Sequence, residues 1–302
     1  MDRDTVDWAG PMPAVTTPFL ADGGIDRAGF KANIRRLMAL GATGVVACGC
    51  TGEFWTLSMS ERKALYADAV EAVGPKGTAI VGAGAITLAD TLELCRAAKA
   101  AGAHGVLVLP PYFVKLADDD IHAHYAAVSE AIDLPMMVYN IPGNAVNAVT
   151  PALADRLANL DKVVAIKESS GDWNNFHSTL IAVKDRVRVF CGPSSVFGVP
   201  AVTLGADGTV DCFPNVWAGC LDLFYAARDG RAKQAEALQA TGRRMTDLFV
   251  TSGRTLYPAT KAAMDMQGFP GGGAPRSPLR PLVGEPLEGL RRGMIALGAM
   301  AA

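Results

Sequence analysis

Eight short apolar runs recur along the first 215 residues, and each is followed by a polar or Gly-rich stretch and then by a segment with helical spacing. The runs are almost continuous in apolar residues, as is typical of parallel strands that are buried on both faces. Eight repeats of strand and helix favour a closed (β/α)₈ barrel, a TIM barrel of the α/β class. We predict strands at Ala14–Thr17, Gly44–Cys48, Ala79–Ala83, Gly105–Leu109, Pro135–Tyr139, Val163–Lys167, Val187–Cys191 and Gly208–Cys212.

An open, doubly wound sheet is the alternative architecture, but no G-x-G-x-x-G motif follows the first predicted strand. After about Val216 the pattern stays helical, apart from a Gly- and Pro-rich connection at Gly268–Pro281. We therefore predict a catalytic barrel over residues 1–215 and a C-terminal helical extension over residues 216–302. The predicted helices are Ile25–Leu40, Ser60–Val73, Leu88–Ala101, Asp118–Ala131, Thr150–Asn159, Trp173–Val183, Trp217–Arg228, Arg231–Phe249, Leu256–Met266 and Glu288–Met300.

Composition narrows the kinds of partner this chain binds. Half of the 302 residues are hydrophobic and the formal net charge is −2, so no general attraction to nucleic acid or anionic membrane is expected. The N-terminal segment MDRDTVDWAG lacks the pattern of a signal peptide, and no apolar run approaches transmembrane length. The six cysteines form no C-x-x-C pair and indicate buried thiols in a reducing compartment. We expect a cytoplasmic protein whose partner is a small molecule.

Lys167 closes the sixth predicted strand, at the end where barrel enzymes carry their catalytic groups. Alternation along the strand places its side chain on the same face as Ala165 and Ser169. A lysine amine among apolar neighbours loses solvation of its charged form, so its pKa falls towards neutrality. The neutral amine can then attack a ketone and form an imine. A lysine that caps the strand and extends to water is the alternative, and position alone favours it.

Two further segments carry suitable chemistry. Tyr139 ends the fifth predicted strand, and a phenol beside an imine can transfer protons to and from the substrate. An aromatic residue packed on the barrel rim is the alternative for Tyr139. The second predicted strand is followed by Gly49–Glu53, whose glycines let backbone N–H groups turn inward while Thr51 adds a hydroxyl donor. Such a turn can bind a carboxylate without a cation, although Gly-x-x-Gly is also an ordinary tight turn.

In this order and spacing, the three segments resemble the dihydrodipicolinate synthase/N-acetylneuraminate lyase family of class I aldolases. The shared motifs are Gly-x-Thr-Gly-Glu, Tyr-Asn-x-Pro and Ile-Lys-Glu-x-x-Gly-Asp, and the resemblance extends from Pro13 to Leu282. It implies that Lys167 is the Schiff-base lysine and that Tyr139 is the proton-transfer phenol. It also implies a homotetramer built as a dimer of dimers. The implied binding residues are Cys50, Thr51 and Gly52 at the substrate carboxylate, and Gly192 and Val210 in the wall around the imine.

Departures from the family pattern change the expected substrate. Dihydrodipicolinate synthases have a Thr at the position of Cys50 and a second Tyr at that of Phe113, and this chain has neither hydroxyl. The Tyr that a neighbouring subunit usually contributes falls near Tyr112 and Phe113, where this chain has changed. In those enzymes an Arg binds the carboxylate of the aldehyde substrate, and this chain has Asn144 at that position. We therefore expect the distal end of its substrate to be hydroxylated and uncharged. The strings Leu109–Phe113 and Arg254–Lys261 look more like the family's sugar-acid dehydratases, nearest to 2-keto-3-deoxypentonate dehydratases such as L-2-keto-3-deoxyarabonate dehydratase.

The predicted reaction converts a 2-keto-3-deoxypentonate to 2-oxoglutarate semialdehyde. Lys167 forms an imine at C2, a C3 proton is lost, and the enamine expels the C4 hydroxyl, which Ser169 and Ser170 are placed to position. The iminium is the electron sink, so no metal or other cofactor is expected. A retro-aldolase that breaks C3–C4 and releases pyruvate is the first alternative. A keto-acid binding protein without turnover is the second.

Overall fold

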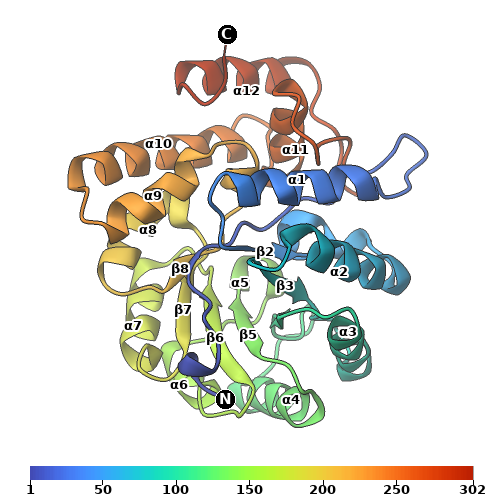
Figure 1. Cartoon of the computed structure of the whole chain (residues 1–302), viewed down its shortest axis with the longest axis vertical. Coiled ribbons are helices and arrows are strands. Elements are labelled where there is room, and N and C mark those ends of the chain that lie inside the picture. Colours follow the sequence, from blue (N-terminus) through green and yellow to red (C-terminus); the bar gives the residue numbers. More distant parts are fainter. Residues whose placement is uncertain (302) are drawn as a thin grey trace.

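A computed structural model describes residues 1–301, in which eight parallel strands form a nearly closed barrel surrounded by helices (Figure 1). The hydrogen-bonded order is β1-β8-β7-β6-β5-β4-β3-β2. Between β1 and β2 the seam is joined by a bridge between Ala14 and Val46 and by neighbouring backbone hydrogen bonds. The predicted TIM barrel is confirmed. Its strands are β1 Gly10–Pro11, β2 Gly44–Ala47, β3 Thr78–Gly82, β4 Gly105–Val108, β5 Met136–Asn140, β6 Val163–Glu168, β7 Arg188–Cys191 and β8 Gly208–Thr209.

The first strand does not lie where the apolar pattern predicts it. The segment Ala14–Thr17 follows β1 and contributes the bridge at Ala14, with hydrogen bonds at 3.0 Å from the Ala14 N–H to the Asp211 carbonyl and from the Val15 N–H to the Val46 carbonyl. Pro13 and Pro18 flank the segment and lack the N–H groups that a ladder needs. Its two threonines instead tie loops together, because the hydroxyl of Thr16 donates to the Gly271 carbonyl and that of Thr17 donates to the Gly52 carbonyl, each at 2.7 Å.

The helices follow the predicted pattern with three exceptions: two unpredicted helices, at Pro142–Ala145 and Ser194–Thr203, and a last helix at Gly284–Ala296, four residues before the predicted Glu288–Met300. The sequence pattern predicts no helix between β7 and β8, yet α8 spans Ser194–Thr203. Gly198, Pro200 and several β-branched residues disfavour a helix there, and the backbone is kinked at Phe197. The other α-helices are α1 Arg27–Ala39, α2 Met59–Val73, α3 Leu88–Ala100, α4 Asp118–Ala131, α5 Pro142–Ala145, α6 Pro151–Leu157, α7 Trp173–Val183, α9 Gly219–Arg228, α10 Ala232–Val250, α11 Leu256–Met266 and α12 Gly284–Ala296. Among residues 1–301, no helix is both long and apolar enough to cross a membrane.

The helices α10, α11 and α12 gather at one end of the molecule, opposite the N-terminus (Figure 1). A buried ion pair joins this part of the chain to the loop after β2. The Lys261 Nζ atom on α11 lies 2.5 Å from a carboxylate oxygen of Glu53, and both side chains are almost completely buried. The other Glu53 oxygen accepts a hydrogen bond from the backbone N–H of Arg276 at 3.0 Å. The ring of Phe19 packs between the charged groups of Lys261 and Arg276. The loop that carries Thr51 is thus fixed by residues from the C-terminal helices.

Candidate active site

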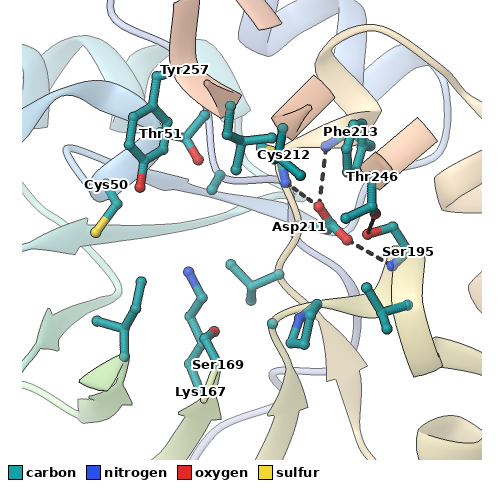
Figure 2. A pocket seen from close by; sticks show the side chains of 18 of the residues that line it. Cys50, Thr51, Lys167, Ser169, Ser195, Asp211, Cys212, Phe213, Thr246 and Tyr257 are labelled. Atoms are coloured by element: carbon teal, nitrogen blue, oxygen red, sulfur yellow. Dashed lines mark hydrogen bonds between the residues drawn. The ribbon is translucent and has the colours of Figure 1, made fainter. Parts of the chain in front are cut away.

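Lys167 points from the end of β6 into a cavity of about 180 Å³ at the C-terminal ends of the strands (Figure 2). Of the predicted site residues, the cavity brings together Lys167, Tyr139, Cys50, Thr51, Ser169, Gly192 and Val210. They come from five separate strands or the loops after them, so they are neighbours only because the barrel closes. The remaining lining residues are Ala14, Ile141, Pro193, Ser195, Val196, Asp211, Cys212, Phe213, Thr246, Val250, Leu256 and Tyr257.

The Lys167 side chain is 4% exposed, and no carboxylate in residues 1–301 lies within ion-pairing distance of its amine. Burial lowers the pKa of Lys167 from 10.5 to about 8, because the charged form loses its hydration. Cys50 and Asp211 oppose the shift. At pH 7 roughly one amine in ten is then neutral, a fraction far above that of a solvated lysine.

Tyr139 lies on β5 directly beside Lys167, because the two residues are register partners in the sheet. The Lys167 Nζ atom is 4.0 Å from the centroid of the Tyr139 ring. Burial is the main reason that the pKa of Tyr139 lies well above 10, and Cys50 and Tyr257 nearby raise it further. The phenol therefore stays protonated at neutral pH and can act as a proton donor next to the amine.

The predicted carboxylate nest is a 3₁₀ turn at Cys50–Gly52. The N–H groups of Gly52 and Glu53 close the turn, whereas those of Cys50 and Thr51 donate to no acceptor within the described residues. Glu53 ends the turn in the left-handed region, with φ of 54°. Burial raises the pKa of the Cys50 thiol, and Lys167 opposes the effect. Cys50 and Thr51 line the cavity, while Gly52 lies behind them and accepts the hydrogen bond from Thr17.

Ser169 and Ser170 follow β6, and they have different surroundings. The Ser169 hydroxyl lines the cavity and is buried with no hydrogen-bond partner in the described part of the chain. Gly192 leaves the space for it, because a Cβ at Gly192 would lie 1.7 Å from the Ser169 Oγ atom. Ser170 lies outside the cavity wall, and its N–H donates to the Glu168 carboxylate at 3.0 Å. Only Ser169 is therefore available to a ligand beside Lys167.

Asn144 lies at the mouth of the site, on the short helix α5. It is exposed, and its Nδ2 atom donates to the Tyr257 hydroxyl at 3.2 Å. Both residues, together with Cys50, line an adjoining aromatic chamber that contains Trp55 and Tyr112. Tyr257 belongs to α11, within a segment that the sequence suggests only as a marker of subfamily. Its role as a wall residue was not predicted.

A second polar wall was also missed from the sequence. Asp211, Ser195 and Thr246 line the side of the cavity that lies, in Figure 2, across the Lys167 amine from Cys50. The Thr246 hydroxyl donates to the Ser195 hydroxyl at 3.0 Å. For Asp211 the signal was available, because it comes two residues after β8, where a barrel carries functional groups. Thr246 lies on α10, and no local pattern marks it.

Comparison with known proteins finds relatives over almost the whole chain. The sequence profile of the dihydrodipicolinate synthetase family matches residues 7–294. The 4-hydroxy-tetrahydrodipicolinate synthase of Desulfotalea psychrophila is 31% identical over 95% of this chain and 96% of its own length. The enzyme of the same name from Synechococcus sp. CC9311 is 34% identical, over 90% of this chain and 89% of its own.

Solved structures agree with the sequence comparison. YagE, a prophage protein of Escherichia coli K12 in the same family, was crystallised with pyruvate and superimposes with a TM-score of 0.92 at 27% identity, over 97% of this chain and all of its own. A putative dihydrodipicolinate synthetase from Pseudomonas aeruginosa gives a TM-score of 0.89 at 30% identity, over 96% of this chain and all of its own. With a family match over almost its whole length and the family fold, the chain belongs to the dihydrodipicolinate synthetase family, a lyase family of the class I aldolase superfamily.

Proposed function

We propose that this lyase binds a 2-keto-3-deoxy sugar acid through an imine on Lys167 and dehydrates it, with a 2-keto-3-deoxypentonate such as L-2-keto-3-deoxyarabonate as substrate. The observation that carries the proposal is the unpaired amine of Lys167, buried against the Tyr139 ring with its pKa lowered to about 8. Class I chemistry needs such an amine, because only the neutral form attacks a ketone. The pyruvate bound to the family member YagE supports a 2-keto acid as ligand.

The cavity wall supports a hydroxylated substrate. Cys50 and Thr51 offer two free backbone N–H groups and the Thr51 hydroxyl to the carboxylate of a keto acid. No lysine or arginine other than Lys167 lines the cavity in residues 1–301, so a second carboxylate would find no cation there. The free hydroxyl of Ser169 and the hydroxyl of Thr246 instead suit neutral hydroxyl groups.

The proposed steps use these groups in order. The Lys167 amine attacks C2, and loss of water gives a protonated imine that acidifies C3. Loss of a C3 proton gives an enamine, which expels the C4 hydroxyl as water when an acid protonates it. Tyr139 is the proton donor beside the amine, and Ser169 hydrogen-bonds the C4 hydroxyl. Transfer of a proton from C5 and hydrolysis of the imine release 2-oxoglutarate semialdehyde and free Lys167, with a net loss of one water.

The test is the product formed from a 2-keto-3-deoxypentonate, combined with reduction by borohydride. We expect the semialdehyde as product, and a mass gain on Lys167 when the reaction is reduced before completion. Release of pyruvate with glycolaldehyde would identify a retro-aldolase that uses the same imine. Binding without an adduct or product would support the binding protein and remove the lyase mechanism.

The lowered pKa of Lys167 predicts how imine formation depends on pH. Below pH 8 the amine is mostly protonated, so the rate of adduct formation with pyruvate should rise about tenfold per pH unit. Above pH 8 the neutral amine predominates and the rate should level off. Initial rates of reductive trapping between pH 6 and 10 measure this. A rate that keeps rising to pH 10 would mean that the lysine titrates as in water.

Replacing Tyr139 by Phe should lower kcat about 10²- to 10³-fold, because the proton donor beside the imine is lost. The ring and its packing are retained, so pyruvate should still be trapped on Lys167, although more slowly. Tyr125→Phe is the matched control, because that phenol is also buried but does not line the cavity. Its hydroxyl donates a hydrogen bond to the Val108 carbonyl at 2.8 Å. Equal kcat values for Y139F and Y125F would contradict the role of Tyr139.

We also propose that the chain assembles as a homotetramer, a dimer of dimers, as its family resemblance implies. Phe113 supports an interface near the mouth of the site, because its side chain is 84% exposed and its backbone is held at φ 81°. The molar mass from light scattering tests the proposal, and a monomer mass at micromolar concentration would reject it.

A further inference from the structure

Asp211 provides the one carboxylate in the wall of the Lys167 cavity, as far as residues 1–301 show. It lies two residues after β8 and is 7% exposed. Every other lining residue apart from Lys167 is apolar, glycine, or a neutral hydroxyl, phenol or thiol. The cavity therefore holds one potential cation and one anion, more than 4.0 Å apart.

The Asp211 carboxylate is fully occupied by protein donors. One oxygen accepts from the N–H groups of Cys212 at 2.7 Å and Phe213 at 3.3 Å. The other accepts from the hydroxyl of Ser194 at 3.0 Å and the N–H of Ser195 at 2.8 Å, at the N-terminus of α8 (Figure 2). A carboxylate has about four acceptor positions, and a helix N-terminus favours negative charge. Protein donors thus fill these acceptor positions and leave none free for a substrate hydroxyl.

The position of Asp211 in the cavity determines which part of a bound ligand lies near its carboxylate. Cys50 lies on one side of the Lys167 amine and Asp211 lies on the other (Figure 2). The placement of the ligand rests on the proposed function. With the substrate carboxylate at Cys50 and Thr51 and its C2 atom at Lys167, the chain beyond C3 extends towards Asp211.

We propose that Asp211 is a specificity-determining residue whose fixed negative charge selects 2-keto acids with an uncharged tail and rejects those with a second carboxylate. Like charges repel strongly in a cavity with little water, and no other side chain in the described wall supplies a compensating cation. Because its acceptor positions are filled, Asp211 acts through its charge and not through a hydrogen bond to the ligand. The selection is therefore a repulsion of the wrong substrate.

The test compares 2-oxoglutarate with its 5-methyl ester, which differ in the charge of the distal group. Each is incubated with the full-length protein, and the adduct on Lys167 is trapped with borohydride and measured as intact mass. For the wild type, we expect half-maximal trapping at an ester concentration at least tenfold lower than that of 2-oxoglutarate. Asp211→Asn and Asp211→Ser should reduce this ratio to about threefold or less. Tyr125→Phe, which removes a buried phenol outside the cavity wall, should leave the ratio unchanged.

Two results would overturn the proposal: equal trapping of the two ligands by the wild type, or an unchanged ratio in a folded D211N or D211S protein. Asp211 supports several backbone groups, so folding of both variants is checked by circular dichroism. If neither variant folds, the proposal is tested by the wild type alone, through the ratio of the two half-maximal ligand concentrations. Pyruvate separates this proposal from the proposed function. If pyruvate forms the adduct but 2-oxoglutarate and its 5-methyl ester are trapped equally, only the proposed role of Asp211 is rejected. If pyruvate forms no adduct on Lys167, the proposed function is rejected as well.

Discussion

Replacing Lys167 by Met should lower kcat about 10⁴-fold or more and abolish the borohydride adduct with pyruvate. Under the proposed mechanism the variant lacks the amine that forms the covalent intermediate, so the remaining contacts can bind a keto acid but cannot supply the electron sink. Met is similar in length and apolar, and the site already removes the amine from water. The free energy of unfolding should therefore change by no more than about 1 kcal/mol.

The control for this variant is Lys99→Met, which removes a lysine whose side chain is 55% exposed and paired with Asp133 on the surface. K99M should retain wild-type kcat and the adduct. Peptide mapping by mass spectrometry locates the modified lysine in each protein. An adduct that persists in K167M, or a kcat within tenfold of the wild type, would assign the chemistry to another residue.

Replacing Lys261 by Met should destabilise the protein by about 3–5 kcal/mol. The substitution leaves the Glu53 carboxylate buried without its counter-charge, and an uncompensated buried charge is costly. Burial lowers the pKa of Lys261, and the neighbouring Glu53 carboxylate opposes this shift. Each buried charge is therefore stabilised by the other. Denaturant unfolding followed by fluorescence measures the loss.

The pair Lys99–Asp133 again provides the control, because it has a similar distance of 2.6 Å but is exposed. K99M should cost less than about 1 kcal/mol. The double variant Glu53→Gln/Lys261→Met should recover part of the loss, since it removes both charges. Equal losses for K261M and K99M would mean that the buried pair is no more important for stability than a surface one.

The barrel could be predicted because parallel strands leave a strong local signal. Val163–Lys167 is a continuous apolar run that ends in a charged residue, and it matches β6 except for one residue at its end. Where local signals conflict with tertiary structure, prediction failed. Pro13 and Pro18 flank Ala14–Thr17 and limit its pairing to Ala14 and Val15. Helix α8 forms despite Gly198 and Pro200 because the barrel needs a crossover between β7 and β8.

The site was predictable where it follows the strand ends. Lys167, Tyr139 and Ser169 line the cavity, as alternation along β5 and β6 suggests. The same alternation places Ser170 on the other face of the strand, with Glu168, whose carboxylate accepts a hydrogen bond from the Ser170 backbone N–H. Tyr257 could not be found this way, because it reaches the cavity from a helix that begins 88 residues after β6 ends (256 − 168), and only the fold brings it there.

The origin of the cavity wall has a consequence for engineering. Proposed imine chemistry resides in Lys167 and Tyr139, whereas the opposite wall comes from Asp211, Ser195 and Thr246, later in the chain. The two sets share no residue and lie on different elements. A combinatorial library confined to the second set would therefore vary what the enzyme accepts while keeping a constant reaction centre. Selection from such a library would change the substrate preference without changing the residues proposed to carry out the reaction.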